Sequence, residues 1–325
     1  MIQYIIRRFL YAIPLLIGVN ILTFVLFFVV NSPDDMARMQ LGQKRVTEQA
    51  INNWKQQHGY NLPLLWNEQA DSQEKITQTI FYQKSVGLFL FRFGVSDSGR
   101  NIGADIQERM WPSLALALPT LIVGLVVDIS FALMLVLYRN RALERIGIVS
   151  CVVLLSISSL FYIIGGQFLF AKVLKWVPIS GYDDGFSALK FLILPILIGV
   201  FSGSGSGVRW YRTLFLEEVG KDYVRTARAK GLTETEALFK HVLPNALIPI
   251  LTGVVVILPL LFMGSLIMES FFSIPGLGSY TLDAINSQDF AIVRSMVFLG
   301  SVLYVLGLLL TDISYTLVDP RVRLS

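Results

Sequence analysis

The sequence predicts an all-α membrane protein with six transmembrane helices and a large extracytoplasmic loop between the first and second. Of its 325 residues, 54% are hydrophobic and 15% are charged, whereas soluble domains carry about 25% charged residues. The mean hydropathy is +0.61. The apolar residues lie in long uncharged runs, and a membrane helix needs about 20 such residues. A water-soluble globular protein is therefore not expected.

The spans follow the uncharged runs in order. The first run has 25 residues, which exceeds the ~7–15 of a secretory signal, so we interpret it as a retained anchor. It completes region 1–33, which is followed by the polar region 34–109 and a five-helix membrane core, 110–325. The predicted spans are 9–33, 110–127 (continuing past Asp128 to Tyr138), 146–171, 191–208, 242–268 and 295–311.

The basic residues between the spans predict the orientation. With a cytoplasmic N-terminus, 14 Lys and Arg residues lie inside and 13 outside. Nine of the 13 belong to region 34–109, and loops longer than about 60 residues count little. The remaining comparison, 14 against 4, predicts that both termini are cytoplasmic. The net charge of +4 is thus explained by membrane topology, without a basic face for nucleic acid.

Cysteine and histidine are too scarce for a disulfide framework or a zinc site. Cys151 is the single cysteine, and His58 and His241 are the two histidines. A disulfide needs two cysteines and a structural zinc site needs about four ligands. No metal ligand set is predicted.

Region 34–109 is polar and carries both signs of charge. It contains Trp54, Tyr60 and Trp66 and a helix-like stretch near 67–84. Two interpretations have equal weight. The region is either a solvated loop with surface aromatics or a docking surface for a partner.

The longest cytoplasmic segment, 209–244, has an ordered pattern. Helical spacing from Leu214 to Lys230 predicts one helix. Gly231 then supplies the left-handed position that commonly ends a helix.

A second, short helix is predicted to follow. Thr233 and Glu236 form the capping box that starts a helix, and we expect that helix to stop near Pro244. The result is an amphipathic helix held rigidly at the cytoplasmic face. Taken alone, such a helix is most simply an interfacial one.

Two strings in this segment resemble a known motif. Tyr223-Val-Arg-Thr-Ala-Arg-Ala-Lys-Gly231-Leu is followed by His241-Val-Leu-Pro244-Asn-Ala-Leu-Ile-Pro249. Together they closely resemble the loop by which permease subunits of ABC importers engage their ATPases, commonly written E-A-A, three residues, G, nine residues, I-x-L-P.

The match is closest to one branch of that family. The second alanine, the glycine and the final proline of the motif are present, whereas Arg225, Thr226 and His241 depart from it. The departures at 225 and 226 are those expected of the dipeptide, oligopeptide and nickel importer permeases. The resemblance implies the ATPase-coupling residues Tyr223, Arg225, Ala227, Gly231, Leu232, Thr233, Glu236 and Pro244.

Four further strings extend the resemblance over nearly the whole chain. They are Arg7-Arg8-Phe-Leu at the first span, Phe93-Gly-Val-Ser96 before the second, Phe272-Ser-Ile-Pro-Gly-Leu-Gly278 in the last outer loop and Asp319-Pro-Arg321 at the C-terminus. Asn31-Ser-Pro-Asp34 differs from the Gly-Asp-Pro that usually follows the first helix.

The resemblance implies a permease subunit of an ABC importer in the bacterial inner membrane, with 110–325 as its five-helix permease core. The implied partners are a second homologous permease subunit, two cytoplasmic ATP-binding subunits, an extracytoplasmic substrate-binding protein and membrane lipid, but no nucleic acid. Short peptides are the first expected cargo, and a nickel chelate, glutathione or a peptide antibiotic are alternatives.

The sequence shows no phosphate-binding loop. The glycine-rich Ser202–Gly207 lacks the Gly-Lys-[Ser/Thr] ending that holds nucleotide phosphates. We therefore expect no cofactor on this chain, ATP and Mg in the partner ATPase subunits, and no enzymatic activity of its own. Gly199, Gly203 and Gly207 recur every four residues, which predicts helix packing rather than a ligand site.

Three charged residues stand out near or within the spans. Asp128 lies within a span, where an ionised carboxylate costs roughly 2.5–3.5 kcal/mol. It is either a group of the transport pathway or a buried structural polar residue, with equal weight. Glu269 and Arg294 flank a turn at Pro275-Gly276, and we expect them to shape an outer mouth.

Two other classes of protein were weighed. An intramembrane serine hydrolase needs a base within reach of a serine, but His58 lies in a loop and His241 at the cytoplasmic edge. A secondary transporter is expected to embed ion-coupling groups in paired, interrupted spans, and Asp128 is the sole candidate within a span. The secondary transporter is kept as the alternative.

Overall fold

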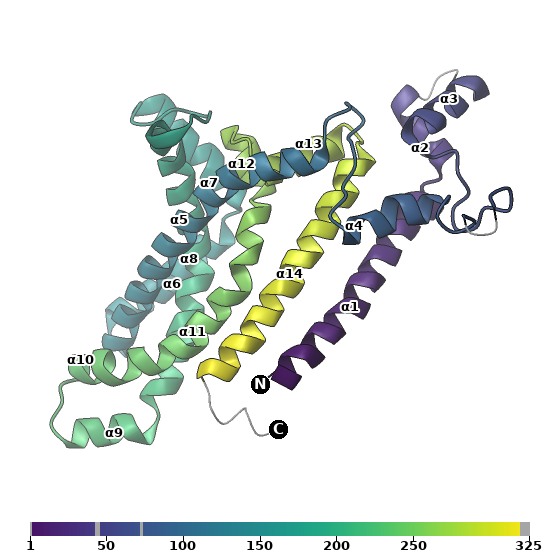
Figure 1. Ribbon diagram of the computed structural model, residues 1–325. Helices are drawn as coiled ribbons and strands as arrows, with labels where there is room; N and C mark the ends of the chain where they lie inside the picture. Colours follow the sequence, from purple (N-terminus) through teal and green to yellow (C-terminus); the bar gives the residue numbers. More distant parts are fainter. Residues whose placement is uncertain (1, 43–45, 72–73, 319–325) are drawn as a thin grey trace. The chain divides into compact units, whose positions relative to one another are not determined.

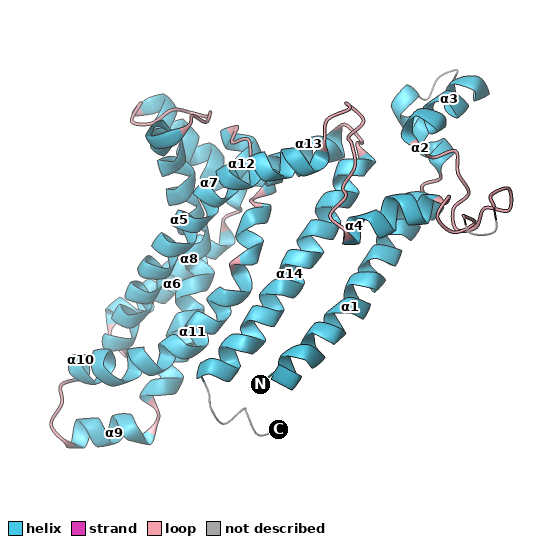
Figure 2. Ribbon diagram, viewed as in Figure 1, coloured by secondary structure: helices cyan, strands magenta, loops and turns pink. Residues whose placement is uncertain are grey.

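Figures 1 and 2 show the computed structural model, which describes residues 2–42, 46–71 and 74–318. Within these residues the chain is helical and forms no β-strand beyond an isolated bridge between Val95 and Asn101. The all-α prediction is confirmed. The string predicted to end the resemblance, at 319–321, lies outside the described residues.

The helices differ widely in length, and short π-helical or 3-10 segments (η) extend several of them. In chain order the helices are α1 (Ile2–Phe24), η1 (Val25–Val30), α2 (Pro33–Leu41), α3 (Glu48–His58), η2 (Phe81–Val86), α4 (Gly87–Phe89), α5 (Ile102–Leu137), α6 (Ala142–Ser156), α7 (Ser159–Gly166), η3 (Gln167–Val173), η4 (Gly185–Ala188), α8 (Leu189–Val219), α9 (Asp222–Ala229), α10 (Glu234–Ala237), η5 (Leu238–Val242), α11 (Leu243–Ile257), η6 (Pro259–Met263), α12 (Leu266–Phe272), α13 (Leu277–Asn286) and α14 (Phe290–Val318).

Five helical stretches of the described chain are long and apolar enough to cross a membrane, and a sixth span exists if one bent pair is counted. The pair is Ala142–Ser156 with Ser159–Val173, bent by 89°. The six-span prediction is consistent with this count. The five continuous stretches are Ile6–Val30, Ile102–Leu137, Gly185–Val219, Glu234–Met263 and Phe290–Ser314.

The third span is not the single straight helix expected over 146–171. Ile157 is extended (φ −93°, ψ 126°), and the chain restarts as α7 after Ser158. Serine side chains compete with the helical backbone for hydrogen bonds, and Ser156 Oγ donates to the Val152 carbonyl over 2.8 Å. The Tyr162 hydroxyl donates to the Leu154 carbonyl (2.9 Å), which satisfies an acceptor that the end of α6 leaves free.

The fifth span ends at Met263, earlier than the predicted 268. The chain leaves the helix at Gly264, whose φ of +67° and ψ of −167° only glycine adopts without strain. A Cβ at Gly264 would lie 1.8 Å from Glu269 Oε1, so there is also no room for a side chain.

The chain divides into two compact units. Unit 1 comprises Met1–Arg109 with Tyr280–Leu309, and unit 2 comprises Met110–Ser279 with Leu310–Ser325. Each unit has its own buried apolar core.

The core of unit 1 is aromatic. Phe24 and Phe28, from the end of the first span, pack with Trp54 and Tyr60, which are each 6% exposed. The interpretation of these two as surface aromatics is therefore wrong, although Trp66 is exposed. They anchor α2 and α3 to the span as a folded cap.

The helix expected near 67–84 forms only toward its end, as η2. Asn67 bonds within the preceding stretch, where its Nδ2 donates to the Gln78 carbonyl (3.2 Å) and its Oδ1 accepts from the Gln69 N–H (3.1 Å). Such side-chain bonds offer the backbone an alternative to a helical ladder.

Arg294 is also buried inside unit 1, at 3% exposure, rather than placed at an outer mouth. Its guanidinium carbon lies 5.3 Å from the centroid of the Phe28 ring, so stacking on an aromatic face takes the place of water.

The core of unit 2 joins α5, α6 and α8 to the segment 222–243. α6 and α8 approach closely at Gly205, where an added Cβ would lie 2.8 Å from the Cys151 carbonyl oxygen. Gly205 does not fit the four-residue spacing of the predicted glycine stripe. The sequence could not predict its contact, because it does not show which face of α8 is covered by α6.

The three glycines of the predicted stripe differ in their surroundings. A Cβ at Gly199 would lie 2.8 Å from Thr120 Cγ2, and one at Gly207 would lie 2.0 Å from Asp128 Oδ2. Both glycines thus allow α5 to approach α8 closely. Apart from its own helix, no described atom lies within 4 Å of a Cβ built at Gly203, so the packing predicted for it is not made by the part of the chain that the structure describes.

Asp128 is 8% exposed and packs against Gly207. Its Oδ1 is buried and has no hydrogen-bond partner among the described residues. This geometry matches a buried polar residue, and a role in the transport pathway stays a prediction.

Candidate functional site

The segment from the end of α8 to the start of α11 is the candidate site, and we call residues 222–243 the coupling segment. Figure 1 shows its helices α9 and α10 one beside the other at one end of unit 2, where they are in contact. The single helix expected from Leu214 to Lys230 is in fact two, because α8 ends at Val219 and α9 starts at Asp222. Gly220, a weak helix former, and the extended Lys221 make the break.

Gly231 ends α9 with a positive φ of +91°, as predicted. Its N–H donates to the Arg228 carbonyl (2.9 Å), and the N–H of Leu232 donates to the Ala227 carbonyl (3.3 Å). This pair of bonds is the Schellman motif, which satisfies carbonyls that the helix end leaves free.

The predicted capping box at the start of α10 is confirmed. Thr233 Oγ1 accepts from the Glu236 N–H (3.3 Å), and Glu236 Oε2 accepts from the Thr233 N–H (3.0 Å). Both helix ends that face the connection at 230–233 are therefore closed by their own hydrogen bonds, which makes the connection stiff.

The second helix does not stop near Pro244, contrary to expectation. α10 continues through the π-helical η5 into α11 without an intervening loop (Figure 1). Pro244 lies just after the π-helical η5, which already departs from the regular α-helical ladder, and the His241 carbonyl accepts a hydrogen bond from Asn245 Nδ2 (2.7 Å). The fifth span thus includes the short helix, from Glu234 to Met263.

One face of the coupling segment is buried in the core of unit 2. Val224, Ala237, Leu238 and Val242 are at most 4% exposed and pack in one cluster with residues of α5 and α8. Burial of this size gives each larger side chain about 1.5–3 kcal/mol of stabilisation. The segment is therefore part of the fold and not an appendage.

Tyr223 ties α9 to the end of α8. Its hydroxyl donates to the carboxylate of Glu218. Burial, followed by this hydrogen bond, raises the pKa of Tyr223 well above its usual range, so the hydroxyl stays protonated and keeps donating.

The opposite face of the segment is exposed. Arg225 has 72% of its side chain exposed and lies 3.4 Å from Asp222, and Phe239 is 51% exposed. An exposed aromatic beside basic residues is typical of protein interfaces. The motif did not single out Phe239, and the signal that could have found it is a large apolar residue on the polar side of a short amphipathic helix.

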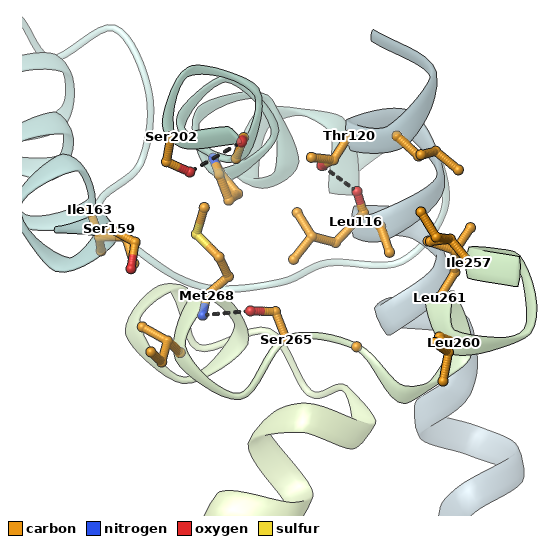
Figure 3. A pocket seen from close by; sticks show the side chains of 16 residues that line it. Leu116, Thr120, Ser159, Ile163, Ser202, Ile257, Leu260, Leu261, Ser265 and Met268 are labelled. Atoms are coloured by element: carbon orange, nitrogen blue, oxygen red, sulfur yellow. Dashed lines mark hydrogen bonds between the residues drawn. The ribbon is translucent and has the colours of Figure 1, made fainter. Parts of the chain in front are cut away.

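A cavity of about 460 Å³ lies elsewhere in unit 2, among α5, α7, α8, η6 and α12. Figure 3 shows Met268 pointing into it from α12. Thr120 donates to the Leu116 carbonyl (2.7 Å) and Ser202 to the Gly199 carbonyl (3.2 Å), so their hydroxyls are occupied by their own helices. The cavity therefore offers mainly apolar contact, and Asp128 does not line it.

Glu269 is a fully buried carboxylate and not a residue of an outer mouth. It accepts hydrogen bonds from Ser113 Oγ (2.8 Å), the Ser265 N–H (3.1 Å) and the Ser279 N–H (3.0 Å). Burial raises the pKa of Glu269, and these donated hydrogen bonds oppose the shift. The carboxylate fastens α5, α12 and α13 together within unit 2.

These features define a multi-pass membrane protein whose fifth span continues into a stiffly capped pair of short helices. Residues 129–324 match the family model described as binding-protein-dependent transport system inner membrane component. Residues 1–79 match the model for the N-terminal part of such membrane components. The chain belongs to this family, and it is an inner-membrane permease subunit of an ABC importer. The resemblance found in the sequence is confirmed.

Several similar relatives are transport permeases over their full length. The chain is 30% identical to the oligopeptide transport system permease protein AppB of Bacillus subtilis (strain 168), covering 99% of this chain and 100% of the relative. It is 28% identical to the dipeptide transport system permease protein DppB of Alkalihalophilus pseudofirmus, with 99% and 100% coverage. It is 29% identical to the glutathione transport system permease protein GsiC of Salmonella choleraesuis, with 99% coverage of both. None of these three names supports the secondary-transporter alternative.

Proposed function

We propose that this chain imports short peptides as one of two permease subunits, working with two cytoplasmic ATPases and an extracytoplasmic binding protein. The observation that carries the proposal is the coupling segment, which is capped on both sides of Gly231 and continuous with the fifth span. A stiff coupling segment that is continuous with a membrane helix can transmit a rigid-body movement of a bound ATPase to that helix.

The exposed face of the segment is the surface we assign to the ATPase. Arg225 and Phe239 lie on it, whereas Ala227 and Leu238 are buried beneath. The capping residues Thr233 and Glu236 and the glycine between the helices hold that face in place. Leu232 and Pro244 are proposed to hold the backbone at the two ends of the short helix, Leu232 through its N–H bond to the Ala227 carbonyl and Pro244 at the start of α11.

The proposed cargo rests on the relatives. AppB and DppB are named for oligopeptides and dipeptides, and GsiC for glutathione, which is itself a small peptide. Glutathione is the second candidate for this reason. A nickel chelate and a peptide antibiotic have no such support among these three relatives.

We further propose that this chain performs no ATP chemistry and that the partner ATPases hold ATP and Mg. The support is the lack of the phosphate-binding Gly-Lys-[Ser/Thr] pattern in the sequence.

The test is reconstitution of the importer in lipid vesicles. Peptide-loaded binding protein should stimulate ATP turnover several-fold, because a ligand outside reaches a distant ATPase by favouring one global state of the permease. The purified chain alone should bind no ATP, and glutathione should compete with peptide uptake if it is the cargo. Uptake that follows an imposed proton gradient, with ATP turnover insensitive to the binding protein, would reject the proposal.

We also propose that both termini are cytoplasmic. A cysteine at Ala142, near Asn140, should be labelled by an impermeant thiol reagent only from the cytoplasm, and a cysteine at Gln69 only from outside. Both positions are exposed, and the native Cys151 is fully buried and should stay unlabelled. The physical reason is the 14 to 4 excess of basic residues in the short loops. Labelling of both positions from the same side would contradict this orientation.

A further inference from the structure

A second cavity of unit 2 lies against the coupling segment and has a volume of about 290 Å³. This greatly exceeds the ~10–15 Å³ that one water needs, so a group of several atoms fits. Its wall comes from the end of α5, the turn between α5 and α6, the end of α8, and α9 to η5.

The charged groups of its wall are three arginines and one glutamate. Arg139 and Arg141 come from the turn after α5, and Arg228 comes from α9, where it pairs with Glu234 over 2.9 Å. The Nε of Arg228 is buried and has no hydrogen-bond partner among the described residues. The wall therefore has an excess of two positive charges and at least one unused donor.

The nearby acid Glu144 offsets this excess only in part, because its charge acts on Arg139 but it forms no ion pair with it. Glu144, at the start of α6, already accepts from Arg212 and from the Asn140 N–H (2.6 Å). Within the part of the chain that the structure describes, neither Arg139 nor Arg141 makes an ion pair, and Arg141 lies 5.5 Å from the centre of the Tyr138 ring. Guanidinium groups without a carboxylate are ready to bind an anion in bidentate fashion.

The rest of the wall is apolar. Val136, Leu137, Val219 and Val242 line it, and Leu137 is the last residue of a membrane span. A cavity with guanidinium groups on one side and aliphatic side chains on the other suits an amphiphile at a membrane surface.

We infer that this cavity binds the phosphate of an acidic phospholipid headgroup, held by Arg139, Arg141 and Arg228. A phosphate group presents pairs of oxygens that accept two parallel hydrogen bonds from a guanidinium group. A phosphate here joins the α5–α6 turn to α9, so the bound lipid restricts movement of the coupling segment relative to the end of α5. The inference concerns a lipid site and does not depend on which cargo the importer carries.

The test uses the assembled importer in detergent and native mass spectrometry with added phosphatidylglycerol, phosphatidylcholine or inorganic phosphate. The wild type should retain phosphatidylglycerol in preference to phosphatidylcholine, whose choline cation offsets its phosphate. The double variant Arg139→Gln/Arg141→Gln should raise the dissociation constant for phosphatidylglycerol by about tenfold or more, because charge-assisted hydrogen bonds are lost. Both positions lie outside the coupling segment, so ATPase attachment is not altered directly.

The matched control is Arg145→Gln, an exposed arginine on α6 that does not line the cavity and should retain phosphatidylglycerol like the wild type. Retention of inorganic phosphate that the double variant abolishes, without phosphatidylglycerol, would support the phosphate site and assign it to free phosphate. Equal retention of phosphatidylglycerol by the wild type and the double variant would overturn the proposal. So would retention that appears only after the ATPases are removed, since the arginines would then face an acidic ATPase surface.

Discussion

Replacing Gly231 with valine is expected to reduce transport by roughly 5- to 30-fold while the importer still assembles. Gly231 has a φ of +91°, a backbone conformation that a β-branched residue strongly resists. The strain of ~1–2 kcal/mol corresponds to a factor of roughly 5–30 between two states of the coupling segment. Peptide uptake and ATP turnover in vesicles measure the effect together.

The Gly231→Val substitution tests backbone strain alone, because there is space for a side chain at this position. No described atom lies within 4 Å of a Cβ built at Gly231, so the loss cannot come from a clash. Gly231→Asn, which tolerates positive φ, should restore most of the transport. Gly220→Ala is the matched control at the other end of α9, where φ is −75° and alanine fits. Full, coupled transport by Gly231→Val would contradict the assigned role of the connection.

The parts of the site that the sequence predicted correctly are those decided within a few residues. The capping box joins Thr233 to Glu236, and the helix end at Gly231 depends on bonds to Arg228 and from Leu232 to Ala227. Hydrogen bonds between residues so close in the sequence are nearly independent of the tertiary fold, so they can be predicted from one sequence alone.

The parts that failed depend on partners distant in the sequence. Glu269 meets Ser113, which is 156 residues away, and Gly205 meets the backbone at Cys151 on another helix. Periodicity shows which residues share a face but not which helix covers that face. The interpretation of region 34–109 with surface aromatics, one of the two that were weighed, failed in the same way, since the burial of Trp54 depends on Phe28 at the end of the first span.

The course of the chain around Pro244 shows a different limit. Proline commonly ends a helix, and that rule predicted a stop. The structure avoids the conflict by placing Pro244 in the first turn after a π-helical segment. A proline is therefore a better indication that a helix is locally irregular than that the helix ends there.

Replacing Glu269 with alanine is expected to have the largest effect on stability. The change removes the acceptor of three hydrogen bonds and leaves the Ser113 hydroxyl and the Ser265 and Ser279 N–H groups buried. Each unsatisfied buried donor costs about 1–3 kcal/mol, and a protein of this kind has a total stability of only about 5–15 kcal/mol. Thermal unfolding in detergent should show a large loss, and Glu217→Ala, an exposed acid on α8, should show little.

Glutamine at 269 separates the charge from the shape of the side chain. Glu269 lies in α12, beyond the end of the fifth span at Met263, and burial raises its pKa above the value of about 4.3 that it has in an unfolded chain. A folded-state pKa above the unfolded value means that stability from this group is greatest below the unfolded pKa and is lost as pH rises through the folded pKa. The wild type should therefore unfold more easily as the pH rises through that range. Glu269→Gln should lose this pH dependence, because it cannot ionise.

If Glu269→Gln keeps the pH dependence of the wild type, another group is responsible for it. If Glu269→Ala unfolds like the wild type, the buried carboxylate does not hold α5, α12 and α13 together.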